Sequence, residues 1–144
     1  MSTSFKWGIL GASKFALEQM APAIHAAKGN SLVALATKDK EKANKFLALS
    51  DSMKIFNDYS VLLEDPDINA VYIPLPNHIH IEWAMRCLKA GKHVLCEKPT
   101  AINSTEVTKM FAACKANGVQ FMDGTMWSHH PRTREMKAVL ESGK

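Results

Sequence analysis

Short apolar runs alternate with helical segments along the chain, and this alternation restricts the fold more than any other feature of the sequence. The runs are rich in β-branched and aromatic residues, which favour strands. We expect six strands, at residues 5–10, 31–36, 54–56, 70–75, 93–96 and 119–122. We expect helices between and after them, at residues 15–28, 40–49, 59–64, 79–90, 106–117 and 131–141. A crossover helix returns the chain to the same end of a sheet, so this order predicts parallel strands in an α/β fold.

Glycine residues mark the ends of three predicted helices. Gly29, Gly91 and Gly118 each follow a helical segment, where a residue that tolerates a left-handed conformation ends the helix before the next strand. Asn103 followed by Glu106 has the spacing of a capping box, which marks a helix start. These boundaries agree with the alternation of strands and helices.

The two most continuously apolar strands, residues 5–10 and 70–75, are expected at the centre of the sheet, where helices cover both faces. In a doubly wound sheet such strands flank the switch point, and ligands bind there at the carboxyl ends of the strands. We therefore expect the strand order 3-2-1-4-5-6 with helices on both faces. With 144 residues, 47% of them hydrophobic, the chain suits one domain over residues 1–144.

The charge pattern and the apolar runs argue against two kinds of partner. The net charge of +4 is spread among residues of both signs, as in Lys38-Asp-Lys-Glu-Lys42, so no nucleic-acid partner is expected. A mildly basic chain of this kind instead suits a small anionic ligand. No apolar run approaches membrane-spanning length and the N-terminus has no signal-peptide pattern, so no membrane anchor or export is expected.

The cysteines and histidines show no pattern of disulfides or metal ligands. Cys87, Cys96 and Cys114 are widely spaced among apolar neighbours, which is typical of buried thiols in a cytoplasmic protein. His129 and His130 are adjacent and therefore point in different directions. No carboxylate or thiolate completes a ligand set with them, so no metal is expected.

A glycine-rich segment, Gly8-Ile-Leu-Gly11-Ala-Ser13-Lys-Phe-Ala16, lies where the first predicted strand turns into the first helix. In the register of the dinucleotide fingerprint G-x-G-x-x-G/A, Gly11 makes the tight turn, Ser13 replaces the middle glycine and Ala16 packs the helix on the strand. The Ser13 side chain narrows the approach of the backbone to a pyrophosphate, although its hydroxyl can donate to a phosphate oxygen. The candidate cofactor-binding residues of this loop are Gly11, Ala12, Ser13, Lys14 and Phe15. The alternative is a helix-start loop that binds no ligand.

Two further stretches are more specific, Pro74-Leu-Pro-Asn-His-Ile-His80 and Gly91-Lys-His-Val-Leu-Cys-Glu-Lys-Pro99. They resemble the glucose–fructose oxidoreductase, inositol dehydrogenase and rhizopine-catabolism (Gfo/Idh/MocA) family of oxidoreductases. The dinucleotide domain of that family carries a strand ending in Pro-Asn-x-x-His and, one helix later, Gly-Lys-His-Val-x-x-Glu-Lys-Pro. The resemblance implies a Rossmann fold that binds a nicotinamide dinucleotide.

The resemblance extends over essentially the whole chain, from Trp7 to Gly143. The segment Asp123-Gly-Thr-Met-Trp127, followed by Pro131, is similar to the stretch with which the family crosses toward its substrate domain. The similarity is greatest to the branch that contains dimeric dihydrodiol dehydrogenases, NADP-linked xylose dehydrogenases and their plant relatives. In that family a second domain follows the helix that corresponds to residues 131–141, and we expect that domain to be absent from this chain.

Lys98 is the candidate catalytic residue. It lies just after the fifth expected strand, where the strands end at the ligand crevice. Its ammonium can donate a hydrogen bond there to a substrate hydroxyl or carbonyl, and so stabilise the alkoxide that develops during hydride transfer. The resemblance implies that Glu97 hydrogen-bonds the cofactor ribose and that the Lys98–Pro99 peptide bond is cis. The alternative is an exposed pair of charges after a strand.

Four more residues become cofactor-binding candidates through the resemblance: Pro74, Asn77, His80 and Trp127. Asn77 and His80 match the Pro-Asn-x-x-His positions near the nicotinamide ribose, and Trp127 matches a Trp that covers the cofactor. His80 is equally well explained as a structural histidine, and Trp127 as a core residue. The family often has Arg two residues after this Trp, whereas this chain has His129 there.

The end of the second strand favours NADP(H) over NAD(H). An acid that binds the ribose 2′-hydroxyl normally lies about twenty residues after the fingerprint, but Ala36 is followed here by Thr37 and Lys38. A hydroxyl and an ammonium suit a 2′-phosphate, so Thr37 and Lys38 are candidate ligands. The alternative is a solvated turn, and Asp39 lies close by in the sequence.

The leading hypothesis is the NADP(H)-binding domain of an oxidoreductase that transfers hydride between nicotinamide and a sugar, polyol or dihydrodiol. A homodimer is compatible with this hypothesis. One alternative is a truncated binding or regulatory module that holds NADP(H) without turnover, and another is an α/β scaffold without a cofactor. Without a second domain to cover the nicotinamide, we expect these residues to bind cofactor but not to catalyse efficiently.

Overall fold

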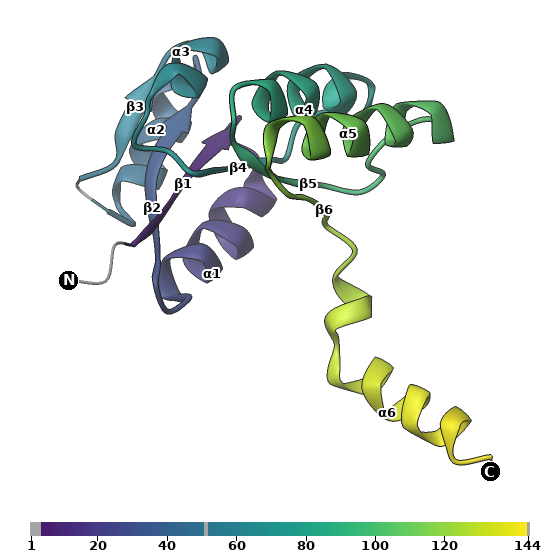
Figure 1. The fold of residues 1–144 in the computed structure, drawn as a ribbon. Helices are drawn as coiled ribbons and strands as arrows, with labels where there is room; N and C mark the ends of the chain where they lie inside the picture. The colour runs from purple at the N-terminus through teal and green to yellow at the C-terminus, as the bar shows by residue number, and fades with distance from the viewer. Residues whose placement is uncertain (1–3, 51, 144) are drawn as a thin grey trace.

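A six-stranded parallel sheet forms the centre of the structure, a computed structural model that describes residues 4–50 and 52–143 (Figure 1). The strands are β1 (Phe5–Leu10), β2 (Asn30–Ala36), β3 (Lys54–Phe56), β4 (Ala70–Ile73), β5 (His93–Cys96) and β6 (Phe121–Asp123). Their order is β3-β2-β1-β4-β5-β6, and each neighbouring pair is parallel. The strand order and the parallel pairing expected from the sequence are therefore confirmed.

Helices follow the strands throughout the described part of the chain. The α-helices are α1 (Ala21–Ala26), α2 (Lys40–Leu47), α3 (Tyr59–Glu64), α4 (His80–Lys89), α5 (Ser104–Asn117) and α6 (Pro131–Glu141). The shorter elements are a π-helical turn, η1 (Ala16–Met20), and two 3₁₀ turns, η2 (Asn77–Ile79) and η3 (Met126–His129). None of the described helices is long and apolar enough to cross a membrane.

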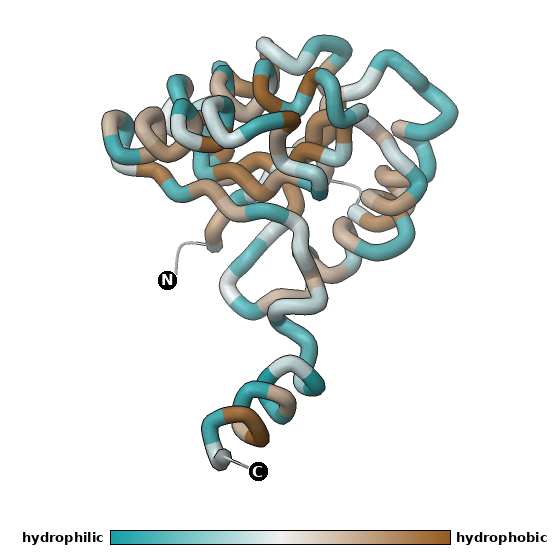
Figure 2. The backbone as a smooth tube through the Cα atoms, turned by 90° about the vertical axis from the view of Figure 1, so that its right-hand side faces the viewer, coloured by the Kyte–Doolittle hydropathy of each residue, from teal (hydrophilic) through white to brown (hydrophobic). Residues whose placement is uncertain are grey.

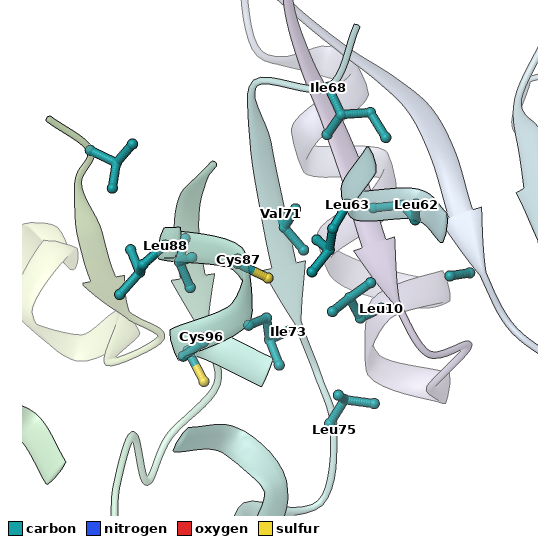
Figure 3. Packing of buried hydrophobic residues seen from close by; sticks show 14 of the residues in the cluster. Leu10, Leu62, Leu63, Ile68, Val71, Ile73, Leu75, Cys87, Leu88 and Cys96 are labelled. Carbon is teal, nitrogen blue, oxygen red and sulfur yellow. The ribbon is translucent and has the colours of Figure 1, made fainter. Parts of the chain in front are cut away.

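Apolar side chains pack on both faces of the sheet and form two buried clusters. One cluster, which includes Leu10 and Ile73, lies between the sheet and α3, α4 and α5 (Figure 3). The other, which includes Ile9 and Tyr72, lies between the sheet and helices α1 and α2. Successive strand residues therefore point to opposite faces, and helices cover both faces as the sequence predicts.

The helix expected at residues 15–28 is divided in two, with the π-helical turn η1 before α1. Pro22 is the physical reason. It has no N–H, and in a regular α-helix its ring would meet the carbonyl four residues earlier. The chain instead makes a wider turn, closed by a hydrogen bond from the Ala21 N–H to the Ala16 carbonyl, and α1 then begins around Pro22.

Three strands differ slightly from their expected bounds. β2 begins at Asn30 rather than at residue 31. β4 ends at Ile73 rather than at residue 75, because Pro74 has no N–H for the ladder. β6 runs from Phe121 to Asp123 rather than from 119 to 122. None of these shifts changes the order of the strands in the sheet.

Two glycines and an asparagine set helix boundaries as expected, whereas Gly29, with a φ of 80°, lies three residues after the end of α1 at Ala26 and does not end that helix. Gly91 and Gly118 have φ angles of 72° and 65°, the left-handed conformation that ends α4 and α5. At the start of α5, the Asn103 side-chain oxygen accepts a hydrogen bond of 3.0 Å from the Glu106 N–H. The Glu106 carboxylate accepts a hydrogen bond from the Ile102 N–H, at 3.1 Å. The predicted helix start is therefore confirmed, with the return bond displaced by one residue.

The η3 turn and α6 lead away from the sheet and its covering helices (Figures 1 and 2). No residue of α6 is buried. Its exposed apolar side chains include Met136, Val139 and Leu140, the last of them 78% exposed. This part of the chain therefore contributes nothing to the two buried clusters.

Asn103→Ala should lower the free energy of unfolding by about 1 kcal/mol, because it removes the side-chain cap of α5. Asn103→Asp keeps an oxygen acceptor at the same place and should stay close to the wild type. The measurement is the midpoint of urea unfolding followed by circular dichroism. Equal midpoints for all three proteins would show that the cap does not stabilise the fold.

Candidate functional site

The loops that follow β1, β4, β5 and β6 meet at the carboxyl edge of the sheet and line one cleft of about 490 Å³. Parallel strands explain this convergence, because they all end at the same edge. The lining residues are Ser13, Phe15, Pro74, Leu75, Asn77, Glu97, Lys98, Gly124 and Met126. The glycine-rich loop, the Pro-Asn stretch and the Glu-Lys pair selected from the sequence are therefore brought together.

Gly11 makes the tight turn at the end of β1. Its φ of 91° lies in the left-handed region, and its N–H donates a hydrogen bond of 2.9 Å to the Ala36 carbonyl. A Cβ at this position would lie 2.8 Å from Cδ2 of Leu75 and 3.4 Å from the Tyr59 hydroxyl. Both the backbone conformation and the space therefore require glycine.

Ser13 occupies the middle position of the fingerprint, where its hydroxyl oxygen accepts a hydrogen bond of 3.0 Å from the Ala16 N–H. That bond uses the oxygen as an acceptor and leaves the hydroxyl proton available to an acceptor in the cleft. The next residue, Lys14, is exposed and lies 3.8 Å from the Glu18 carboxylate. The substitution of serine for glycine therefore stabilises the start of the helical turn and still offers a donor to a ligand.

Glu97 is held at the end of β5 with its carboxylate in the cleft wall. Its N–H donates to the Ile73 carbonyl at 3.0 Å. Oε1 accepts a hydrogen bond of 2.8 Å from the Tyr72 hydroxyl, and Oε2 accepts one of 3.3 Å from the Lys98 N–H. The carboxylate is therefore fixed in place while it remains partly open to the cleft.

Lys98 is exposed and lines the same cleft as Ser13 and Asn77. The Lys98–Pro99 peptide bond is cis, as the family resemblance implies. Asn77 is also exposed and begins the η2 turn that leads into α4. An ammonium and a side-chain amide thus both face the space where a ligand would lie.

His80 differs from the expectation. Its side chain is fully buried, with Nδ1 2.9 Å from the Pro99 carbonyl and Nε2 2.6 Å from the Leu75 carbonyl. A side chain with no exposed surface cannot meet a cofactor in this conformation. We therefore correct the expectation of cofactor binding by His80: the ring instead ties together the loops that follow β4 and β5.

At the end of β2, Thr37 and Lys38 differ in their exposure to solvent. Thr37 is only 8% exposed, and its hydroxyl oxygen accepts a hydrogen bond of 3.2 Å from the Asp39 N–H, whereas Lys38 is exposed. Asp39 caps α2 by accepting from the Lys42 N–H at 3.0 Å and pairs with the Lys42 ammonium at 3.3 Å. That backbone hydrogen bond from Lys42 holds the pKa of Asp39 below its ordinary value. Asp39 is therefore already committed to the start of α2.

Two smaller clefts flank the end of β2. One, of about 260 Å³, lies beside the glycine-rich loop and is lined by Ala12, Ser13, Lys14, Leu17, Glu18, Lys42, Lys45 and Phe46. The other, of about 360 Å³, is lined by Lys38, Asn57, Asp58, Tyr59 and Trp83. Lysine side chains outnumber acidic ones in the first cleft, so it suits an anionic group.

Trp127 is 64% exposed in η3 and does not line the large cleft, although its neighbour Met126 does. It is therefore not a core residue in this structure. The expected contact between Trp127 and a cofactor stays a prediction. His129 lies at the other end of η3 and lines a separate cleft with Phe121 and Asp123.

Several residues that line or support these clefts were missed from the sequence. Tyr72, Gly124 and Tyr59 belong to segments whose pattern indicates only a strand, a crossing segment and a short helix. No local signal distinguishes them, because their roles depend on partners far away in the chain. Trp83 likewise reads as an ordinary residue of an amphipathic helix.

The residues present fit a dinucleotide. The Gly11 turn leaves no room for a side chain, Ser13 has a free hydroxyl proton, and Glu97 keeps acceptor capacity toward the cleft. These features lie along one edge of the sheet, at the switch point between β1 and β4. Donors of this kind suit the oxygens of a pyrophosphate, and acceptors of this kind suit the hydroxyls of a ribose.

The comparisons with known proteins agree with this geometry. D-xylose 1-dehydrogenase (NADP(+)) 2 of Haloferax volcanii is 34% identical over 139 residues, which are 94% of this chain and 42% of that protein. Trans-1,2-dihydrobenzene-1,2-diol dehydrogenase of Xenopus laevis is 32% identical over 136 residues, 94% of this chain and 41% of that protein. The crystal structure of KijD10, a 3-ketoreductase from Actinomadura kijaniata in complex with NADP and TDP-benzene, superposes with a TM-score of 0.90 at 33% identity, over 97% of this chain and 43% of that one.

The chain thus spans about two fifths of the length of the curated relatives it matches. The family described as "Oxidoreductase family, NAD-binding Rossmann fold" (GFO_IDH_MocA) matches residues 5–125, most of the chain. The chain therefore belongs to the Gfo/Idh/MocA oxidoreductase family and forms its NAD-binding Rossmann fold.

Proposed function

We propose that this chain binds NADP(H) and forms the cofactor domain of an oxidoreductase that acts on a sugar, polyol or dihydrodiol. The observation that carries the proposal is the shared cleft in which Ser13, Asn77, Glu97 and Lys98 lie together. The relatives support it, since their names specify NADP, a 3-ketoreductase, a xylose dehydrogenase and a dihydrobenzenediol dehydrogenase. Each of those names implies a carbon that carries a hydroxyl or a carbonyl group.

The residues of the cleft would divide the work between binding and proton transfer. When bound, the nicotinamide exchanges a hydride with the substrate carbon. Lys98 donates a hydrogen bond to the substrate oxygen, stabilises negative charge on it and exchanges the proton. Glu97 accepts a hydrogen bond from a ribose hydroxyl, and Ser13 donates one to a phosphate oxygen.

The preference for NADP(H) over NAD(H) is supported by the surroundings of β2. The acid nearest its end, Asp39, is occupied by the α2 cap and by Lys42. The lysines nearby, Lys38, Lys42 and Lys45, line the two smaller clefts and can meet a 2′-phosphate. Thr37 is almost buried, so Lys38 is the stronger candidate of the pair selected from the sequence.

The free cysteines support a reducing compartment for this protein. Cys87 and Cys96 are buried and Cys114 is partly buried, and none of the three is in a disulfide. Burial raises the pKa of Cys96 to about 12, so its thiol stays protonated and unreactive. We therefore propose a cytoplasmic location. A homodimer stays a prediction.

A cofactor-binding module without turnover is the alternative function, and the openness of the large cleft favours it. Lys98 and Met126 are exposed and leave this cleft open to water. Much of an enzyme's rate depends on electrostatics in a site that excludes water. We therefore expect these 144 residues on their own to bind NADPH with turnover near background.

Gly11→Ala should raise the dissociation constant for NADPH by about 100-fold or more, because a methyl group meets Leu75 in the turn where backbone approaches the pyrophosphate. Gly29→Ala is the matched control, since Gly29 also has a positive φ but has nothing within 4 Å of its Cβ position. It should lose stability without losing affinity. The measurement is the fluorescence of NADPH during titration, and equal affinity of both variants would contradict the placement of the cofactor.

Lys38→Ala and Lys45→Ala should each weaken NADPH binding by about 5- to 10-fold and leave NADH binding unchanged, because only NADPH carries a 2′-phosphate. Lys115→Ala, at an exposed position of α5, is the control for loss of one positive charge. Dissociation constants are compared at one ionic strength. Tighter binding of NADH than of NADPH by the wild type would contradict the proposed preference.

Lys98→Met should leave NADPH affinity within a few-fold while lowering turnover by about 10²- to 10⁴-fold, because methionine keeps the length of lysine but has no proton to donate. The binding arm uses the present chain. The turnover arm uses the longest form of the protein that contains these residues, with a panel of sugars and diols. Unchanged turnover would show that another group exchanges the proton.

A further inference from the structure

Tyr72 is the largest fully buried side chain among the described residues, yet its hydroxyl contacts the candidate site. In the strand register it lies between Ile9 of β1 and Leu95 of β5. Its ring packs in the apolar cluster on the face covered by α1 and α2. From there the hydroxyl donates a hydrogen bond of 2.8 Å to Oε1 of Glu97. A residue of the sheet interior thus contacts a carboxylate in the wall of the cleft.

The Glu97 carboxylate is held by two hydrogen bonds. Besides the Tyr72 hydroxyl on Oε1, the Lys98 N–H donates to Oε2 at 3.3 Å. Gly124 leaves room for the carboxylate, because an added Cβ there would lie 3.0 Å from Oε1 and 3.1 Å from Oε2. The ion pairs found within residues 4–50 and 52–143 do not include Glu97. Neutral donors therefore hold this carboxylate.

The Tyr72 phenol stays protonated near neutral pH. Burial raises the pKa of its phenol far above the ordinary value, and the hydrogen bond to Glu97 raises that pKa further. The protonated phenol therefore serves as a donor to Glu97. Two hydrogen bonds leave the carboxylate with unused acceptor sites, because an ionised carboxylate has about four.

We infer that Tyr72 is a positioning residue, whose hydroxyl holds the Glu97 carboxylate so that an unused acceptor site receives a hydroxyl of the nicotinamide ribose. The inference rests on the proposed binding of NADP(H). Without the phenol, the Glu97 side chain can rotate, and ordering it on binding costs conformational entropy. The hydroxyl thus favours ligands that bring a hydrogen-bond donor to this place, and it does so without touching them.

The test compares two ligands on Tyr72→Phe, which removes the hydroxyl and keeps the ring. NADPH should bind about 3- to 10-fold more weakly than to the wild type, because one hydrogen bond to a charged group no longer orients Glu97. Adenosine 2′,5′-bisphosphate carries no nicotinamide ribose, so its dissociation constant should not change. NADPH is titrated by fluorescence and the bisphosphate by calorimetry.

Two further variants test the route of the effect. In a Glu97→Ala background, Tyr72→Phe should cause no additional loss of NADPH affinity, because the group it positions is gone. Gly124→Ala should reproduce the selective loss of NADPH affinity, because its methyl group displaces the carboxylate. This second variant keeps the β4 core and the Tyr72 hydroxyl, so it tests whether the position of the Glu97 carboxylate controls NADPH affinity even if Tyr72→Phe does not fold.

The outcomes separate the positioning role from the proposed function. Equal losses for NADPH and the bisphosphate, no loss for either, or a full loss in the Glu97→Ala background would each overturn the role of Tyr72. Failure of the wild type to bind either ligand would overturn the proposed function, and the positioning role with it. Selective loss in Tyr72→Phe and Gly124→Ala supports both.

Discussion

The parallel pairing of β1 with β4 is the constraint on which the rest of the structure depends. Residues 7–9 pair with residues 70–72, and the chain continues from β1 toward β2 and β3 but from β4 toward β5 and β6. The loops at the carboxyl ends of these two strands therefore diverge, and a ligand can lie between them. Gly8 allows α3 to pack directly over this seam, since a Cβ there would lie 3.0 Å from Cδ2 of Leu62. Both buried clusters are built outward from this pair of strands.

The fold could be predicted from the sequence because its determinants are local and repeated. Each strand has an apolar run, and each connection between strands has helical spacing. A right-handed crossover is the connection that returns the chain to a parallel position in the sheet. The differences arose where one residue overrides the pattern. Pro22 divides the first helix and Pro74 ends β4 early, because each removes a backbone donor that regular structure needs. Such effects shift boundaries without changing the topology.

The candidate site was only partly predictable, because its support comes from long-range contacts. Gly11, Glu97 and Lys98 follow strand ends, so topology alone brings them to one edge of the sheet. Tyr72 carries no such signal. Its hydroxyl meets a carboxylate 25 residues away only because β4 and β5 pair in one particular register. For the same reason the sequence could not decide whether His80 binds the cofactor or has a structural role. Its buried position is set by the Leu75 and Pro99 carbonyls, which belong to two different loops. The second of these loops begins only after β5.

Some residues of the sequence motifs are buried and never face the cleft. Their hydrogen bonds to the backbone explain why they occur beside the motif residues that do face it. Lys92, in the stretch between α4 and β5, is 7% exposed and donates hydrogen bonds of 2.8 Å to the Asp65 and Ile68 carbonyls. It thereby fixes the turn that leads into β4, as His80 fixes the loops that leave β4 and β5. Burying an ammonium or an imidazole without a hydrogen-bond partner destabilises the fold. Lys92 and His80 each therefore require their backbone carbonyl partners in place. The two ends of β4 are therefore set by side chains of α4 and of the following turn. The strand that carries Tyr72 is thereby anchored at both ends, beside the carboxylate in the cleft wall.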